Sequence, residues 1–216
     1  MAFMKIAEPD VTLTDYGLAL ECALFAVLLY RLSDHAGPWR TWFTVFFAAL
    51  AAAALAGGTA HGFVYDKQTV AHRLIWNATL IAIGVVAWSA WMIASRFECA
   101  RRAAGLVRWI GTTVFIGYCF FVLFVRNTFA VAIIHYLPAV IFLLIAFVHG
   151  YLHSRKQHLL TGLIGLSLTL VAAGTQQTGI ALHPVYFDHN ALYHLIQAFA
   201  MLMLFLSARG IVRYGV

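Results

Sequence analysis

Long apolar stretches separated by short polar segments run along the whole chain. Seven of them are close to the roughly 20 residues that a helix needs to cross a bilayer. They cover approximately residues 15–32, 41–62, 73–95, 106–125, 128–149, 158–179 and 190–208. Because backbone groups in lipid must be hydrogen-bonded within each span, these stretches are predicted to be helices rather than open strands. The pattern predicts an all-α membrane protein, a seven-transmembrane-helix bundle.

The composition agrees with burial in lipid. Hydrophobic residues make up 63% of the 216 residues and charged residues only 10%, against roughly 45–50% and 25% in ordinary soluble domains. The connections between the stretches are too short to hold a separate soluble domain. Residues 1–216 are therefore predicted to form a single integral membrane domain.

The basic residues are divided unequally between the two ends of the predicted bundle. Four lie on the side of the N-terminus: Lys5, Lys67, Arg73 and Arg126. Ten lie on the opposite side: Arg31, Arg40, Arg96, Arg101, Arg102, Arg108, Arg155, Lys156, Arg209 and Arg213. The positive-inside rule predicts an N-terminus outside and a cytoplasmic C-terminus. A multi-pass integral membrane protein, in the cytoplasmic or inner membrane if the source is bacterial, accounts for the net charge of +6 without nucleic-acid binding.

Histidines collect at the N-terminal side of the predicted bundle. Six of the ten lie there: His61, His72, His135, His183, His189 and His194. The other four lie at the opposite side: His35, His149, His153 and His158. Neutral imidazole is the commonest metal ligand, and three ligands with one open position form a catalytic zinc site. The cluster therefore predicts zinc as a cofactor.

Four of these histidines are the candidate zinc ligands. His61 ends the second stretch and His72 opens the third, so the short turn between them lets the two approach each other. Asn190 and His194 are four residues apart and share one face of the last helix. His189 can join from a loop or capping position. We expect His61 and His194 to bind the ion, with His72 and His189 as alternatives for the third ligand.

Two polar residues within the stretches are candidates for catalysis. Glu21 is predicted to be the one acid well inside a helix, where a buried carboxylate costs about 2.5–3.5 kcal/mol and needs a partner. It is predicted to act as a general acid or base, to orient a histidine, or to serve as a hydrogen-bonding strut. Asn77 in the third stretch is predicted to be a polar helper in the same cavity.

The placement of these residues resembles the CREST superfamily of seven-helix membrane proteins, which includes alkaline ceramidases, progestin and adipoQ receptors and Per1-like proteins. The likeness rests on His61 at the end of helix 2, His72 about 11 residues later, and the segment with His194 that opens helix 7. Members are typically described as binding zinc through one His of helix 2 and an HxxxH pair of helix 7, with a Ser before the first His and an Asp in helix 3. Here Gly57, His72 and Asn190 stand at the Ser, Asp and first HxxxH positions.

The resemblance implies a zinc-dependent membrane hydrolase that acts on a lipid amide or ester at the outer side of the membrane. The partners that the resemblance implies are membrane lipids and a lipid-like substrate. Because three motif positions differ, a non-catalytic descendant that uses the same cavity as a receptor or as a metal- or lipid-binding protein is the alternative.

The same residues also bear on other classes of membrane protein. A single-haem b-type protein is a further alternative, with His61 or His135 opposite His194. His135 and His149 are 14 residues apart on one predicted helix, and two stacked haems would need a second helix with the same pair. The residues 14 positions from His61 and His194 are Phe47 and Ala208, so a two-haem arrangement is not expected. A retinal Schiff base is excluded, because none of the three lysines lies in a predicted helix.

Overall fold

Seven long helices are present in the computed structural model, which describes residues 6–32, 37–183 and 186–216 without the side chains of residues 98 and 99. Lys5 and His35, assigned to opposite ends above, lie outside the described residues. The helices are α1 (Pro9–Tyr30), α2 (Pro38–Gly62), α3 (Val70–Ala94), α4 (Ala104–Phe124), α5 (Phe129–Ser154), α6 (Gln157–Thr178) and α7 (His189–Tyr214), with a 3-10 helix, Glu98–Ala103, before α4. All seven are long and apolar enough to cross a membrane, and the described residues form no β-strand. The all-α prediction is confirmed.

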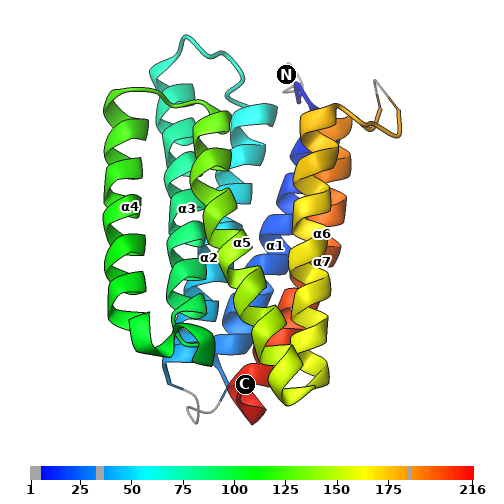
Figure 1. The fold of residues 1–216 in the computed structure, drawn as a ribbon. Coiled ribbons are helices and arrows are strands. Elements are labelled where there is room, and N and C mark those ends of the chain that lie inside the picture. Colours follow the sequence, from blue (N-terminus) through cyan, green and yellow to red (C-terminus); the bar gives the residue numbers. More distant parts are fainter. Residues whose placement is uncertain (1–5, 33–36, 184–185) are drawn as a thin grey trace.

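Six of the helices close into a ring. Contacts run from α1 to α2, α2 to α3, α3 to α5, α5 to α6, α6 to α7, and from α7 back to α1. The fourth helix, α4, lies outside this ring at one edge of the bundle and packs mainly on α3 (Figure 1). Most of α4 is exposed, and its buried residues are Gly111, Tyr118 and Val122.

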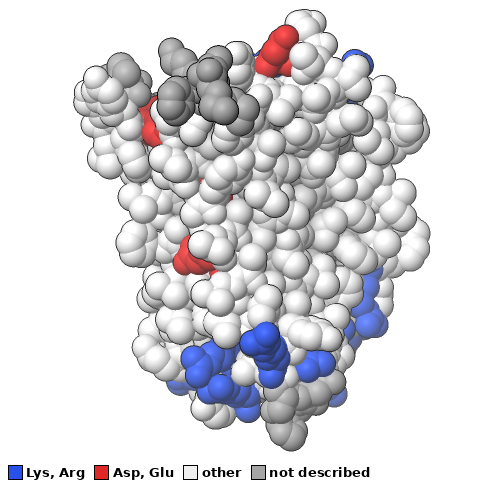
Figure 2. Space-filling view, turned by 180° about the vertical axis from the view of Figure 1, so that it is seen from behind, with Lys and Arg blue, Asp and Glu red and all other residues white. Residues whose placement is uncertain are grey.

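The two ends of the bundle differ in charge. On the face that Figure 2 shows, Lys and Arg side chains gather at the end where the C-terminus lies in Figure 1. We call this the basic end and the opposite one, near the N-terminus, the N-terminal end. The predicted separation of basic residues is therefore present in the fold.

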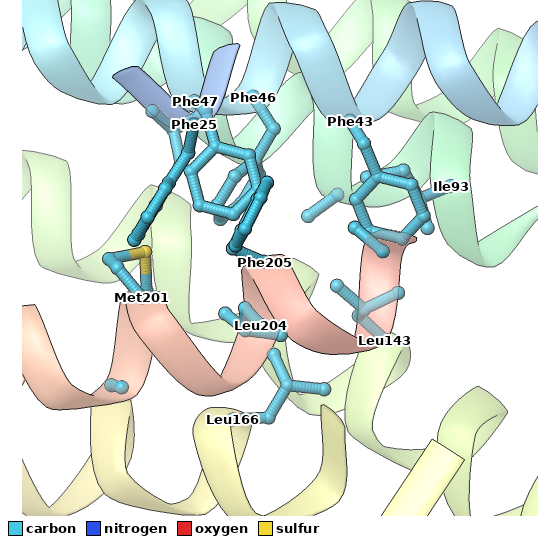
Figure 3. Close-up of a cluster of buried hydrophobic side chains, with 14 of the residues drawn as sticks. Phe25, Phe43, Phe46, Phe47, Ile93, Leu143, Leu166, Met201, Leu204 and Phe205 are labelled. Atoms are coloured by element: carbon cyan, nitrogen blue, oxygen red, sulfur yellow. The ribbon is translucent and has the colours of Figure 1, made fainter. Parts of the chain in front are cut away.

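An aromatic core fills the half of the bundle next to the basic end. Phe25 of α1 stacks on Phe205 of α7 with ring centroids 4.3 Å apart, and Phe47 of α2 meets both rings edge-on. Figure 3 shows these rings beside apolar side chains of the neighbouring helices. Aromatic pairs of this geometry attract each other beyond the area that they bury. They hold α1 against α2 and α7.

Small residues replace the aromatic rings toward the N-terminal end. Positions 51–54 and 56–58 of α2 are all Ala or Gly. A Cβ atom at Gly58 would lie 2.9 Å from Cβ of Asp15, and one at Gly62 would lie 2.7 Å from the Thr12 side chain. Small residues of this kind let helix backbones approach closely. The shortage of large side chains also leaves hollows between the helices at this end.

The first helix begins earlier than the sequence pattern predicted. It starts at Pro9 instead of near residue 15, because proline suits the first helical position and Asp10 favours the first turn. Asp15 therefore lies in the second turn and is only 4% exposed. The prediction that Glu21 is the one acid well inside a helix is wrong, since Asp15 is inside α1 and more deeply buried.

Candidate functional site

Three hollows adjoin one another at the N-terminal end of the bundle. The inner cavity, about 260 Å³, has a lining that includes Asp15, His61, Trp76, Asn190, Tyr193 and His194. The vestibule, about 610 Å³, has a lining that includes Glu8, His61, His72, Arg73, Trp76 and Asn127. The α1–α7 groove, about 380 Å³, has a lining that includes Thr14, Gly17, Leu18, Glu21, His194 and Phe199. His61 separates the inner cavity from the vestibule, and His194 separates it from the groove.

Asp15 of α1 and His194 of α7 form a buried pair in the wall of the inner cavity. The Nε2 atom of His194 lies 3.2 Å from Oδ1 of Asp15, and the two side chains are 11% and 6% exposed. On the other edge of the ring, Nδ1 lies 3.2 Å from the hydroxyl oxygen of Thr14. Both ring nitrogens therefore contact α1, and these contacts fix the orientation of the imidazole.

The hydroxyl group of Thr14 can set the tautomer of His194. A hydroxyl has one hydrogen, and the carbonyl oxygens of Asp10 at 2.8 Å and of Val11 at 3.0 Å lie within its reach on α1. With that hydrogen donated along α1, the Thr14 oxygen accepts a hydrogen bond from Nδ1–H of His194, which is one of the two directions that the 3.2 Å contact allows. In the neutral ring this leaves a lone pair on Nε2, which faces the carboxyl oxygen of Asp15. Two such acceptors only 3.2 Å apart need a shared proton or a cation between them.

His61 stands near the C-terminal end of α2, between the inner cavity and the vestibule. Its Nδ1 atom lies 2.6 Å from Oε2 of Glu8, so Nδ1–H donates to the carboxylate and the Nε2 lone pair remains for a ligand. The ring meets Trp76 edge-on, with centroids 6.2 Å apart. The side chains of His61 and Glu8 are 30% and 51% exposed, so this pair is less confined than Asp15 and His194.

Asn190 shares the α7 face of His194 and is held in place by neighbouring polar groups. The amide of Gln176 donates to Oδ1 of Asn190 at 3.1 Å, and the Asn190 amide donates to Oδ2 of Asp188 at 3.3 Å. Asp188 caps the start of α7, and its backbone N–H donates to Oδ2 of Asp10 at 3.1 Å. This network joins α1, α6 and α7 around the inner cavity.

Two of the four predicted zinc ligands, His72 and His189, lie outside the described lining of the inner cavity that His61 and His194 share. His72 lines the vestibule, where its Nδ1 lies 2.5 Å from a backbone carbonyl oxygen. His189 is the first residue of α7, and its side chain is 41% exposed beside the carboxylate that caps the helix. Of the four predicted ligands, His61 and His194 are therefore brought to one cavity, while His72 and His189 are not among its described lining residues.

His135, a candidate haem ligand, lies in a different part of the bundle. Its ring stacks on Tyr118 of α4 with centroids 4.0 Å apart, and the Tyr118 hydroxyl donates to the carbonyl oxygen of Leu80. His135 is 8% exposed, and its Nε2 has no hydrogen-bond partner among the described residues. The structure therefore does not bring His135 and His194 to the same described cavity.

The two predicted catalytic residues also lie outside the described lining of the inner cavity. Glu21 lines the α1–α7 groove, with Oε2 enclosed and without a partner among the described residues. Asn77 accepts a hydrogen bond of 2.9 Å from the Asn127 amide, and Trp76 donates to the carbonyl oxygen of Asn127. Asn77 thus helps to hold α3 against the loop before α5. The Glu21 carboxyl, in contrast, makes no hydrogen bond with the described residues.

The donors around the inner cavity have the composition of a catalytic zinc site, in which two imidazoles and a carboxylate leave a fourth position open. Ligands about 2.0–2.2 Å from a tetrahedral ion lie roughly 3.3–3.5 Å apart, close to the 3.2 Å between His194 and Asp15. Within the described residues, no three His, Cys, Asp or Glu side chains are grouped closely enough to hold an ion as they stand. A zinc site here therefore requires the partly exposed His61 ring to turn toward the pair.

Asp15 is the site residue that sequence reasoning missed, because the first helix was predicted to begin near residue 15, which places Asp15 at its very start. Two signals in the sequence mark it. Pro9 followed by Asp10 is typical of a helix start. Positions 11, 15, 18 and 22 follow a helical period, and all four are buried in the fold. A helix extended back to Pro9 places Asp15 on the buried face.

Comparison of the sequence with known proteins identifies a family. The chain belongs to a family of unknown function (DUF6962), whose sequence profile matches residues 11–213. No curated protein matched the chain. The matched range runs from α1 to α7 and includes Asp15, His61 and His194.

Proposed function

We propose that this member of the family is a membrane-embedded hydrolase that acts on a lipid amide or ester in the inner cavity. The observation that carries the proposal is that Asp15, His61 and His194, from three different helices, line one cavity. That cavity adjoins a polar vestibule on one side and a largely apolar groove on the other. Such surroundings suit a substrate that has both a polar group and a hydrocarbon chain.

The proposed location is a membrane, with the N-terminal end of the bundle outside. Seven apolar helices support the membrane location. Of the described basic residues, the ten named above lie at the basic end, against Lys67, Arg73 and Arg126 at the other. The positive-inside rule then puts the basic end in the cytoplasm. The inner cavity lies near the outer leaflet in this orientation.

Zinc is the proposed cofactor, with Nε2 of His61, Nε2 of His194 and the carboxylate of Asp15 as its ligands. When bound in such a site, zinc activates water and polarises a carbonyl oxygen. Glu8 contacts Nδ1 of His61 and Thr14 contacts Nδ1 of His194, so Nε2 is the nitrogen left in each ring to bind the ion once the His61 ring turns toward the pair. Tyr193 lines the cavity and supplies a phenolic hydroxyl that can donate to the substrate.

A distant relationship to the CREST superfamily is part of the proposal. It is supported by His61 and His194, which line one cavity from the two helices to which the resemblance assigns zinc ligands. In this chain Asp15 supplies the third ligand, because Oδ1 of Asn190 is already engaged by Gln176. Gly57 at the Ser position leaves room for Asp15, since a Cβ atom there would lie 3.3 Å from Oδ2.

Hydrolysis of a fluorogenic long-chain amide and its ester analogue by the purified protein tests this function. Chelation is expected to abolish turnover, and added zinc to restore it. Asp15→Asn, His61→Ala and His194→Ala are each expected to lower turnover by about a hundredfold or more, since even outer partners of zinc ligands contribute ten- to hundredfold. His189→Ala is the matched control and keeps activity. Turnover that survives chelation and all three substitutions contradicts the proposal.

A second candidate is a non-catalytic, receptor-like or lipid-binding protein. It is favoured by the direct contact between Asp15 and His194, and by the lack of a three-donor group among the described residues. The pair then binds the polar group of a lipid without cleaving it. Binding of the test amide without turnover, in zinc-free and zinc-loaded protein alike, supports this candidate. A visible absorption band identifies a b-type haem protein instead.

A further inference from the structure

The α1–α7 groove is open toward the outside of the bundle and has an apolar wall. Leu195, Ala198, Phe199 and Leu202 of α7 form this wall. Leu195 is 42% and Phe199 is 59% exposed. Because the helices are proposed to lie in a membrane, side chains exposed at this depth face acyl chains rather than water. The groove is therefore accessible to a lipid chain from within the membrane.

Glu21 brings an acid into this apolar groove. Glu21 lines the groove, and neither of its carboxyl oxygens has a hydrogen-bond partner among the described residues; Oε2 is enclosed by protein, so Oε1 is the oxygen that faces an occupant. An unpaired polar group in apolar surroundings is costly, so the carboxyl is complementary to an occupant that brings a hydrogen-bond donor. A hydroxyl group on a hydrocarbon chain is such a donor. An ammonium group is a poorer choice, because charge in the hydrocarbon region is far more costly than a hydroxyl.

The groove leads from Glu21 to the proposed reaction site. His194 and Leu18 line both the groove and the inner cavity. Glu21 follows Asp15 by six residues on α1, which is about 9 Å along a helix axis. Both side chains lean toward the helix N-terminus, so the offset between their carboxyl groups stays about the same, and hydrogen bonds of roughly 3 Å at each end span most of it. A donor that reaches Glu21 thus lies a few carbons from a carbonyl group held at Asp15 and His194.

We propose that the α1–α7 groove binds the acyl chain of the substrate laterally, and that Glu21 selects a chain with a hydroxyl group a few carbons from the amide or ester carbonyl. This rests on the proposed function and narrows its substrate class to hydroxyacyl lipids. The groove takes the chain from the membrane, Glu21 accepts the hydroxyl hydrogen bond, and the carbonyl group enters the inner cavity past His194.

Gly17 allows the groove to be blocked without disturbing the helices. No heavy atom among the described residues lies within 4 Å of a Cβ atom built at Gly17, although Gly17 lines the groove. The side chain in Gly17→Leu therefore fills the groove instead of displacing protein. Gly117 of α4 has equally open surroundings and is not among the described lining residues of the groove. Gly117→Leu is the matched control.

Photo-crosslinking in proteoliposomes tests the proposal with an N-alkyl 3-hydroxyacyl amide that carries a diazirine on its acyl chain, and with its 3-deoxy analogue. Wild type is expected to be labelled on α1 and α7, with about a tenfold preference for the hydroxylated probe, as one hydrogen bond to a carboxylate provides. Glu21→Leu is expected to remove the preference. Gly17→Leu is expected to lower labelling at least about fivefold, which takes only a partial loss of binding free energy, while Gly117→Leu retains it.

Labelling does not depend on turnover, so the two proposals fail separately. Equal labelling by both probes in wild type, or unchanged labelling in Gly17→Leu, overturns the groove assignment and leaves hydrolysis untouched. Selective labelling of the groove in a protein that hydrolyses neither probe supports the groove assignment and contradicts the proposed hydrolase.

Discussion

At the scale of single residues, the orientation of one imidazole depends on two adjacent side chains. Asp15 and Thr14 are neighbours on α1, yet they contact opposite nitrogens of His194. The Thr14 oxygen accepts from Nδ1–H when its own hydrogen is donated to a carbonyl oxygen of α1, that of Asp10 or of Val11. This chain of hydrogen bonds turns the Nε2 lone pair toward Asp15. Thr14 therefore matters through His194 and not through contact with a substrate.

Thr14→Val tests this positioning role. Valine has the shape of threonine but cannot accept from Nδ1–H, so the ring loses the contact that directs Nε2 toward Asp15. We expect the affinity for zinc to fall about ten- to hundredfold, the usual effect of an outer partner of a histidine ligand. Competition with a chelating dye measures this affinity. Thr161→Val is the control, because the described hydrogen bond of the Thr161 hydroxyl is to the carbonyl oxygen of Gln157 within α6. Equal affinities in both variants speak against the role of Thr14.

At the scale of elements, the close approach of α1 and α2 sets the position of Asp15. Gly58 faces the Cβ atom of Asp15 and the ring of Tyr16, and both would lie within 3.0 Å of an added Cβ atom. Neither neighbour is the far end of a flexible side chain. The two helices therefore have to move apart to accept any larger residue at this position.

Gly58→Ala is expected to destabilise the fold by about 1–3 kcal/mol, the usual cost of overpacking. Gly174→Ala is the comparison, since a Cβ atom there meets no described atom within 4 Å. It is expected to gain roughly 0.5–1 kcal/mol from helix propensity. Thermal unfolding in detergent, followed by circular dichroism, gives both values. A Gly58→Ala protein as stable as wild type means that the two helices are not in this close contact.

The helices themselves could be predicted from sequence, because each carries an uninterrupted apolar stretch. Their bounds were less certain where polar residues enter a helix. The start of α1 is the clearest case, since the apolar stretch was predicted to begin near residue 15 whereas the helix begins at Pro9 and includes the polar Asp10. The peripheral place of α4 had no sequence signal either, because its apolar pattern is like that of the buried helices.

At the scale of the whole molecule, the two halves of the bundle differ in packing: the larger hollows lie in one half, and the other holds the aromatic core with one smaller pocket of about 190 Å³. The aromatic core lies toward the basic end, and the three hollows lie toward the N-terminal end. The sequence identified His61 and His194 as candidates for one site. It could not identify Asp15 as their neighbour, because Asp15 and His194 are brought together only when α7 closes the ring against α1.

Labelling in intact cells tests the proposed orientation. Lys67→Cys at the N-terminal end and Arg102→Cys at the basic end are each made in a Cys99→Ser background and treated with a membrane-impermeant maleimide. Because the basic end is predicted to face the cytoplasm, residue 67 is expected to react in intact cells and residue 102 only after permeabilisation. The reverse pattern contradicts the orientation.

X-ray absorption at the zinc edge, together with the zinc content of the purified protein, tests the central claim most directly. About one zinc per chain is expected, with two imidazoles and oxygen donors at roughly 2.0–2.2 Å. The zinc should be lost in Asp15→Ala and His194→Ala but retained in His189→Ala. Wild-type protein that binds no zinc at stoichiometric levels, or binds it equally well without Asp15 and His194, contradicts the claim that these residues share one ion.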